Sequence, residues 1–447
     1  MSKARLPWIT AAASFGFLVT QLDVTIVNVA LDAIGRAFGA PTAQLQWVVD
    51  AYVLALAAML LSAGAIGDRI GPKRAFMTGL VLFGLASAAC GFAGSPLVLI
   101  LARVAQGAAG ALLIPPSLAL IAHAAHGDDR RRAAAVGWWT AAGGVSIAAG
   151  PVLGGLLVES LGWRWVFFVN LPLCLIGAVL THLVAPATPP KPRVPFDLPG
   201  QGLAVAAVTL LVGGLIEGGH RGWRGPPVAA LAFGLVLAIG FVLFERRTAH
   251  PAMPLAVFKR RPAWTAVVVG SGLNFTYYGL IFVLGLYLLR ALHWSPAKAG
   301  LAFLPLTATF IVSNLLSGSL AARFGARTVT AVGVLVAACG YALTARLGAG
   351  SGMGQMLPGF ALIPGGMGLA IPALTSGLLA SVDRSEAGAA SGVLNACRQV
   401  GGAAGVAIFG ALAGAGIVTG LRASGLIAAA MLVGAAGILL LPSKTRQ

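Results

Sequence analysis

Three ionisable residues interrupt apolar stretches in the first quarter of this 447-residue chain. Asp23 stands in LDVTIVNVALD, Asp50 in QWVVDAY and Arg103 in LARVAQGAAGA. A charge inside a bilayer costs about 2.5–3.5 kcal/mol on insertion scales, so such residues are rare and usually have a partner or a function. Carboxylates in this setting can take up and release protons, and an arginine can pair with one of them or tune it.

Counting along the helices predicts that these three residues share one depth. At 1.5 Å per residue, Asp23 and Asp50 lie about 8 Å and Arg103 about 9–10 Å below the outer boundary. Either Asp23 and Arg103 form an ion pair that holds two spans together, or Arg103 tunes a proton-carrying carboxylate. A permanent pair makes protonation of the acid harder, so Asp50, with no obvious basic partner, is the better candidate for the proton carrier.

Other polar side chains in the apolar stretches are candidates for lining a small-molecule cavity. In the first span Gln21, Thr25 and Asn28 share one helical face, roughly opposite Asp23. Such groups either contact a ligand or form hydrogen bonds between helices. Later candidates, which could instead be core or lipid-facing residues, are Asn274, Tyr277, Tyr278, Asn395 and Arg398.

The elements that position these residues are predicted to be membrane helices. The chain is 58% hydrophobic and only 9% charged, with a mean hydropathy of +0.91, whereas soluble domains carry about 25% charged residues. About fourteen apolar runs are long enough to cross a hydrocarbon core of about 30 Å. An all-α polytopic membrane protein is therefore expected. The predicted spans are 8–30, 45–66, 75–93, 97–121, 133–158, 165–185, 199–216, 227–244, 263–289, 299–321, 328–345, 354–380, 389–413 and 420–441.

The net charge of +18 is explained by membrane sidedness. With both termini in the cytoplasm, 20 of the 30 lysines and arginines fall in cytoplasmic segments and eight in outer segments, as the positive-inside rule requires. This distribution predicts a multi-pass protein of the inner (plasma) membrane with anionic cytoplasmic lipid as a partner. It argues against a nucleic-acid partner. The chain is expected to act as a monomer on a small molecule.

An internal repeat predicts how the spans are organised. GAIGDRIGPKR at 64–74 is echoed by GSLAARFGAR at 318–327, with one offset that corresponds to eight spans. Such repeats are typical of secondary transporters. We therefore expect two six-helix halves, 1–190 and 263–447, separated by two inserted helices in 191–262.

The fifth span is rich in small residues at helical spacing. Gly143, Gly150 and Gly154 share one face, and Pro151 lies on the adjacent stripe and can bend the helix. Small residues let two helices approach closely, so these four residues predict a seam that packs tightly and that also moves if the halves rock. The thirteenth span is the repeat partner of the fifth and is likewise Gly-rich, which predicts related positions in the two halves.

Five stretches in order resemble the major facilitator superfamily, and more narrowly its fourteen-span drug/proton antiporter branch of multidrug and antibiotic-resistance exporters. They are LDVTIVNVAL, GAIGDRIGPKR, LARVAQGAAGA, GGVSIAAGPVLGG and WRWVFFVNLP. The resemblance implies proton coupling through Asp23, Asp50 and Arg103, and an antiporter seam at Gly150 and Pro151. It also implies a cytoplasmic gating loop, formed by Gly67, Asp68, Arg69, Gly71, Lys73 and Arg74.

The resemblance further implies proton-driven export of a small amphipathic drug, antibiotic or toxin by alternating access. The proton is the coupling ion, and no other cofactor and no metal are expected. Spans 10 and 13 lack the extra acids of polyvalent-cation exporters, so neutral or singly charged substrates are expected. A proton-coupled symporter for a nutrient and a lipid-handling or sensory membrane protein are the alternatives. Nothing resembles a Walker loop, so an ATP-hydrolysing enzyme is not expected.

Overall fold

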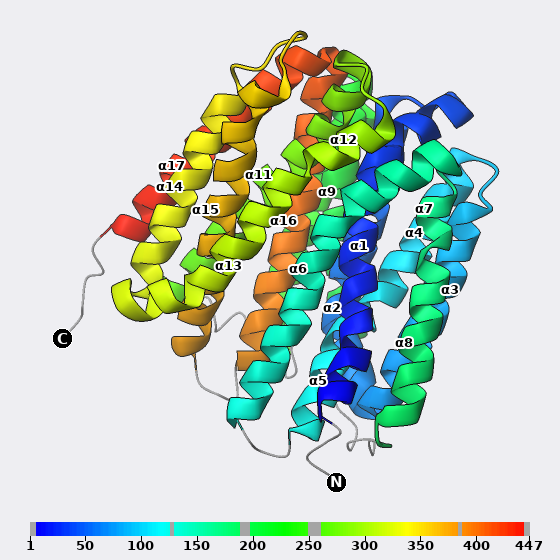
Figure 1. Cartoon of the computed structure of the whole chain (residues 1–447), viewed down its shortest axis with the longest axis vertical. Coiled ribbons are helices and arrows are strands. Elements are labelled where there is room, and N and C mark those ends of the chain that lie inside the picture. The colour runs from blue at the N-terminus through cyan, green and yellow to red at the C-terminus, as the bar shows by residue number, and fades with distance from the viewer. Residues whose placement is uncertain (1–5, 126–128, 188–196, 249–260, 383–386, 442–447) are drawn as a thin grey trace. The chain divides into compact units, whose positions relative to one another are not determined.

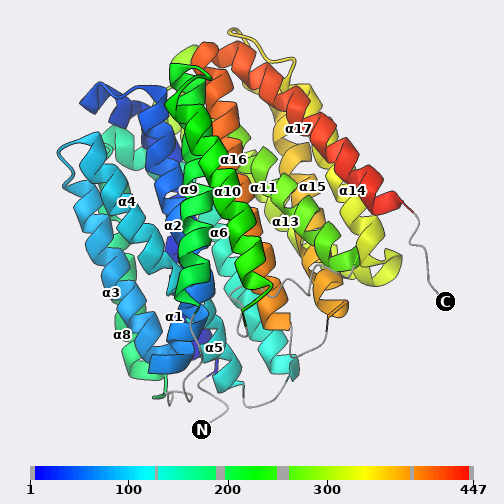
Figure 2. The same ribbon diagram turned by 180° about the vertical axis from the view of Figure 1, so that it is seen from behind.

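The computed structural model describes residues 6–125, 129–187, 197–248, 261–382 and 387–441, and every element in these ranges is a helix (Figures 1 and 2). Fourteen of the described helices or helix pairs are long and apolar enough to cross a membrane. The prediction of an all-α, multi-pass membrane protein with fourteen spans is therefore confirmed. The chain divides into two compact units, which we describe separately.

The first unit comprises Met1–Ala252 together with His293–Leu301. Its elements are α1 (Leu6–Phe38), α2 (Thr42–Ile70), α3 (Pro72–Gly91), α4 (Pro96–Ala111), α5 (Ile114–Ala124), α6 (Asp129–Ser160), α7 (Trp165–Phe168), α8 (Asn170–Val184), α9 (Leu198–Arg221), α10 (Pro226–Glu245) and nearly all of α12 (Pro296–Ala302). The inserted helices α9 and α10 pack side by side (Figure 2), and α9 packs against α2, where the Ser62 hydroxyl donates to Gln201 Oε1. The division of the sequence at 190 and 262 stays a prediction.

The second unit comprises Met253–Leu292 and Ala302–Gln447. Its elements are α11 (Arg261–Leu286), the π-helical turn η3 (Tyr287–Ala291), α13 (Leu304–Phe324), α14 (Ala326–Thr344), α15 (Met353–Ala380), α16 (Ala387–Ala415) and α17 (Ile417–Leu440). Two predicted spans of the first unit are broken helices. Span 4 breaks between α4 and α5, just before Pro115 and Pro116, and span 6 breaks between α7 and α8. A proline lacks the N–H that a continuous helix needs, which explains the first break.

The repeated loop has the same backbone conformation in both units. Gly71, between α2 and α3, has φ 87° and ψ 137°, and Gly325, between α13 and α14, has φ 83° and ψ 142°. Residues with a side chain rarely adopt a positive φ. Glycine at both positions therefore allows two helices to be joined through a single residue.

The cation two residues after each of these glycines binds the end of a later helix in its own unit, α8 in the first and α17 in the second. Lys73 Nζ donates to the carbonyls of His182 and Ala185 at 3.0 and 2.6 Å, at the end of α8. Arg327 donates from Nε to the Leu439 carbonyl and from Nη2 to the Leu441 carbonyl, at the end of α17. The last carbonyls of a helix lack intrahelical partners and carry partial negative charge. The repeated cation thus fastens one helix end in each half.

Glycines of α6 face α1, which runs beside it (Figure 1). A Cβ added to Gly143 would lie 2.0 Å from the Phe17 ring, and one added to Gly150 would lie 2.0 Å from Thr25 Oγ1. A Cβ on Gly154 would lie 2.8 Å from the Ile26 carbonyl oxygen. The predicted packing of the small-residue face is confirmed, and its partner is α1.

The repeat partner α16 packs on α11 in the same way within the second unit. A Cβ on Gly401 would lie 2.5 Å from the Ser271 carbonyl oxygen, and one on Gly405 would lie 2.0 Å from that of Phe275. From the other side, a Cβ on Gly279 would lie 2.7 Å from the Gly405 carbonyl oxygen. The fifth helix of each half therefore packs on the first through glycines, as the repeat predicted.

The second small-residue stripe of α6 is covered by the segment that contains α12. A Cβ on Gly155 would lie 2.3 Å from the Pro296 carbonyl oxygen, and one on Gly300 would lie 2.2 Å from that of Pro151. Glu159 Oε2 accepts a hydrogen bond from the Ala297 amide at 2.9 Å. Both small-residue faces of α6 are thus in contact with another helix of the first unit.

Two alanine substitutions in α6 test this packing. Gly150→Ala should lower the free energy of unfolding by about 1–3 kcal/mol, because its methyl group overlaps Thr25. Gly144→Ala is the matched control, since nothing lies within 4 Å of the added atom and alanine has the higher helix propensity. Thermal unfolding of the purified variants in detergent should rank Gly150→Ala below Gly144→Ala. Equal midpoints would contradict the close approach of α1 and α6.

Candidate functional site

Asp23 and Arg103 form a fully buried ion pair between α1 and α4. Arg103 Nη1 donates to Asp23 Oδ2, and the two side chains are 0% and 1% exposed. Arg103 Nε donates to the Val48 carbonyl at 3.0 Å, and its guanidinium carbon lies 4.2 Å from the ring centroid of Tyr52. Both of these contacts come from α2. The pair therefore connects three helices.

Uncharged side chains complete the surroundings of this pair. Asp23 Oδ1 accepts from Gln106 Nε2 at 2.8 Å and from Asn170 Nδ2 at 3.0 Å. Gln106 Oε1 accepts from Arg103 Nη1 at 2.8 Å, and Ser87 Oγ accepts from both Gln106 and Asn170. Both oxygens of Asp23 are thus satisfied, which a buried charge requires. We call Asp23, Ser87, Arg103, Gln106 and Asn170 the ion-pair network.

A glycine allows α4 to bring this network together. Gly107 follows Gln106, and a Cβ added to it would lie 2.2 Å from the Tyr52 carbonyl oxygen. Any side chain at this position would push α4 away from α2 and lengthen the hydrogen bond from Arg103 to Val48. The spacing Arg-x-x-Gln-Gly therefore has a physical reason.

Asp50 has an environment of the opposite kind. It lies in α2 two residues after Val48 and is 0% exposed, yet neither of its carboxyl oxygens has a hydrogen-bond partner among the described residues. The described ion pairs do not include it either. Depth counting predicted that Asp23, Asp50 and Arg103 share one level. The structure pairs Asp23 with Arg103, whereas Asp50 has no partner in the part of the chain that is described.

Three members of the network, Ser87, Gln106 and Asn170, were not predicted as site residues, although Gln106 stands in the LARVAQGAAGA stretch. Asn170 lies five residues after the predicted outer end of span 6, and Ser87 lies six residues before the predicted outer end of span 3. At 1.5 Å per residue both lie about 8–9 Å below the outer boundary, at the level of Asp23 and Arg103. Depth counting applied to all polar residues, and not only to charged ones, would have found them.

The predicted polar face of α1 is used mainly in packing. The Thr25 hydroxyl donates to the carbonyls of Gln21 and Leu22 and lies against Gly150. Asn28 Nδ2 donates to the Val24 carbonyl at 2.9 Å, and Thr25 and Asn28 are each only 4% exposed. Gln21 is half-buried and is the most accessible of the three. Their predicted role in a substrate cavity stays a prediction.

In the second unit, the structure brings together four of the five predicted polar residues. Arg398 Nε donates to Asn274 Oδ1 at 3.2 Å, which joins α16 to α11. Tyr278 lies beside the Arg398 charge, and the rings of Tyr277 and Tyr278 meet edge to face with centroids 5.5 Å apart. The fifth residue, Asn395, is half-buried on α16, three residues before Arg398.

The gating-loop residues lie at the junction of α2 and α3. A Cβ on Gly67 would lie 3.3 Å from the Pro116 side chain of α5, so the loop abuts the end of span 4. Arg69 and Arg74 are exposed, and Lys73 binds the end of α8 as described above. The side chain of Asp68 lies outside the described residues. The gating role itself stays a prediction.

A cavity of about 520 Å³ in the first unit lies between α1 and α6. It is largely apolar, and its polar lining consists of Thr10 and Ser14 from α1 and Arg131 from α6. Trp138, which is 74% exposed, presents an aromatic surface to it. Apolar lining with a few polar groups is typical of small-molecule sites. None of the described residues that line it is an acid.

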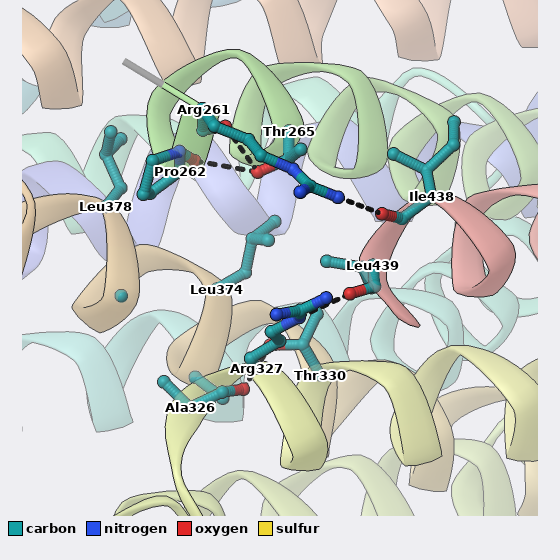
Figure 3. Close-up of a pocket in the computed structure, with 12 residues that line it drawn as sticks. Arg261, Pro262, Thr265, Ala326, Arg327, Thr330, Leu374, Leu378, Ile438 and Leu439 are labelled. Atoms are coloured by element: carbon teal, nitrogen blue, oxygen red, sulfur yellow. Dashed lines mark hydrogen bonds between the residues drawn. The ribbon is translucent and has the colours of Figure 1, made fainter. Parts of the chain in front are cut away.

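A cavity of about 320 Å³ in the second unit lies where α11, α14, α15 and α17 meet (Figure 3). Arg261 and Arg327 point toward the end of α17, where Arg261 Nη2 donates to the Leu441 carbonyl at 2.8 Å. Leu374 and Leu378 of α15 contribute apolar lining. The guanidinium groups of Arg261 and Arg327 bind backbone carbonyls at the end of α17. They therefore hold this helix end in place rather than offering their donors to a ligand.

Comparison with known proteins agrees with these observations. The family model of the Major Facilitator Superfamily matches residues 13–406. The chain is 36% identical over 404 residues to the methylenomycin A resistance protein of Streptomyces coelicolor, covering 90% of this chain and 84% of that protein. It is 36% identical over 410 residues to the tetracenomycin C resistance and export protein of Streptomyces glaucescens (91% and 76%). It is 34% identical over 404 residues to the multidrug resistance protein Stp of Mycobacterium tuberculosis (90% and 74%).

Among solved structures, the fold is similar to that of the POT family transporter PepTSo. The TM-score is 0.71, and the match covers 99% of this chain and 98% of that chain at 15% sequence identity. At this identity the likeness concerns the fold alone. It confirms the predicted bundle architecture.

Replacing each of the two buried acids by asparagine should separate their roles in stability. Asp23→Asn leaves Arg103 buried without a countercharge and should cost about 3–5 kcal/mol. Asp50→Asn breaks no described hydrogen bond and should change stability by less than about 1 kcal/mol, the size of one net hydrogen bond. Thermal unfolding in detergent measures both. A large loss in Asp50→Asn, or none in Asp23→Asn, would contradict the geometry.

Proposed function

Because the chain belongs to the Major Facilitator Superfamily, we propose that it exports a small amphipathic drug, antibiotic or toxin across the plasma membrane in exchange for protons. The named relatives support the substrate class, since they are resistance, multidrug resistance or export proteins over about nine-tenths of this chain. A transporter of this kind is not an enzyme. The bias of lysine and arginine supports cytoplasmic termini.

The observation that carries the proton coupling is the isolation of Asp50. A buried carboxylate without a hydrogen-bond partner is costly in its charged form and favours the neutral, protonated form. When a conformational change hydrates such a group, it can release its proton. Asp50 is therefore the proton carrier: it is protonated when enclosed and deprotonated when open to the cytoplasm.

Asp23 and Arg103 have a different role in this mechanism. Their ion pair is enclosed by Gln106, Asn170 and Ser87, and opening it would leave several buried polar groups without partners. We assign the ion-pair network to holding α1, α2, α3, α4 and α8 together. This keeps the backbone around Asp50 in place while its protonation changes.

Alternating access requires surfaces that can move without losing their fit. The glycine contacts of α6 with α1 and of α16 with α11 provide smooth interfaces, because few side chains interlock there. The clamps at Lys73 and Arg327 keep the last helix of each half attached during such a movement. Each proton that enters supplies about 2.3 kcal/mol per 100 mV of membrane potential. One or two protons are therefore sufficient for a useful substrate gradient.

The direction of proton movement on substrate addition tests the coupling. A tolerance screen of cells that overexpress the chain first identifies a transported compound. Purified protein in weakly buffered detergent should then release protons when this compound is added, because substrate and proton compete in an antiporter. Proton uptake would instead indicate a symporter, and no proton movement would contradict proton coupling.

Substituting two acids one at a time identifies which of them releases the proton. Asp50→Asn should abolish the release and slow transport in proteoliposomes at least about tenfold, as expected when an essential proton carrier is lost. Glu217→Gln is the matched control, because Glu217 lies in α9 and pairs with Arg221 at 2.8 Å. It should leave release and transport unchanged. Full proton release in Asp50→Asn would exclude Asp50 as the carrier.

A further inference from the structure

Arg398 is a cation in a membrane helix, and none of the described residues of its unit forms an ion pair with it. It lies eleven residues into α16, about 17 Å along the helix axis. Among the described residues its hydrogen bonding consists of the contact from Nε to the neutral Asn274 Oδ1. Its terminal nitrogens Nη1 and Nη2 therefore have no described acceptor.

The sequence of the second unit contains no acid that could reach it from a helix. Residues 261–447 contain two acids, Asp383 and Glu386, and both lie in the connection between α15 and α16. No membrane helix of this unit carries a carboxylate. A charge in a membrane helix is expensive and is usually paired or placed toward a polar cavity. The missing partner of Arg398 is thus absent from the helices around it.

The neighbouring helix is shaped to hold this side chain. Gly270, Asn274 and Tyr278 follow one another at intervals of four residues and line one face of α11 toward α16. A Cβ on Gly270 would lie 3.3 Å from Cγ and Cδ of Arg398, so the glycine makes room for its stem. Gly402 on α16, one turn after Arg398, likewise makes room for the Tyr278 ring, which a Cβ would approach to 2.8 Å.

This arrangement holds one edge of the guanidinium group and leaves the other available. Asn274 occupies Nε, and the parallel Nη1–H and Nη2–H donors form the fork that matches a carboxylate. The other clustered arginines differ: Arg103 binds Asp23, Gln106 and the Val48 carbonyl, and Arg327 binds the carbonyls of α17. Of these three arginines, Arg398 is the one whose Nη1 and Nη2 have no described acceptor.

We propose that Arg398 binds an anionic group, a carboxylate or a comparably acidic oxygen, of an aromatic substrate. The edge-to-face pair of Tyr277 and Tyr278 supplies the adjoining aromatic surface, and both rings are half-buried. Arg398 lies within Val393–Ala415, the part of α16 that is apolar and long enough to cross a membrane. This inference rests on the proposed export function and narrows its substrate class to acids.

A matched series of pyrene probes tests the charge preference. The purified full-length protein in detergent at pH 7.5 is titrated with 1-pyrenebutyric acid, its methyl ester and an analogue that ends in a trimethylammonium group. We expect the acid to bind about tenfold or more tightly than the ester, the factor for one charge-assisted hydrogen bond. The trimethylammonium compound should bind most weakly. If the wild-type protein prefers the ester, shows no preference or binds no member of the series, the proposal is wrong.

Two substitutions test whether Arg398 causes the preference for the acid over the ester. Arg398→Gln should weaken binding of the acid about tenfold and leave binding of the ester within about twofold. Asn274→Asp should also remove the preference for the acid, because it places a carboxylate next to the guanidinium group that competes with the ligand. Arg346→Gln, an exposed arginine after α14, is the control and should behave like the wild type.

A purely structural role of Arg398 has a different signature. Arg398→Gln would then weaken acid and ester equally together with a lower unfolding temperature, and Asn274→Asp would retain the preference for the acid. Either result overturns the proposal. Binding is measured without transport, so it stands apart from the export function. If the acid binds through Arg398 but no compound moves in proteoliposomes, the proposed export fails while the anion site remains.

Discussion

The buried ion pair of Asp23 and Arg103 is the interaction on which the first unit depends. It places two opposite charges in an apolar bundle, and every polar group around it is arranged to satisfy them. Asn170 at the start of α8, Ser87 on α3 and the Val48 carbonyl on α2 bring further helices into the same network. Because a single unsatisfied charge at this position is costly, these helices are fixed relative to one another.

The paired charges of Asp23 and Arg103 contrast with two other ionisable groups in membrane helices, Asp50 and Arg398. Asp50 has no described partner for either oxygen, and Arg398 has none for its terminal nitrogens. Burying Asp50 and Arg398 without such partners lowers the stability of the bundle, which indicates that the two residues have a functional role. The first is suited to carrying a proton and the second to binding an anion. The proposed mechanism therefore depends on Asp50 and Arg398, which lack the ion-pair partner that Asp23 and Arg103 provide for each other.

The repeat supplies the mechanical frame for these sites. In each unit a glycine-rich helix, α6 or α16, packs on the first helix, and a cation after the loop glycine binds the end of α8 or α17. The two halves differ most in chemistry. The first carries the buried acids Asp23 and Asp50, whereas the described helices of the second contain no acid and carry the half-buried Arg398. A repeated fold with unequal side chains can therefore assign protons to one half and the substrate anion to the other.

The sequence alone was sufficient for the fourteen helices, the repeat, the family and the two glycine-rich helices. Hydrophobic length and small-residue spacing are local properties, and each can be read without knowing what a helix touches. Depth counting even placed Asp23, Asp50 and Arg103 at one level. It left open which carboxylate pairs with the arginine, because depth gives the height of a residue and not the direction in which its side chain points. That direction depends on how the helices pack. Only the tertiary structure therefore paired Asp23 with Arg103, added Ser87, Gln106 and Asn170 and placed Thr25 against Gly150. It also showed that Asp50 and the terminal nitrogens of Arg398 have no partner among the described residues.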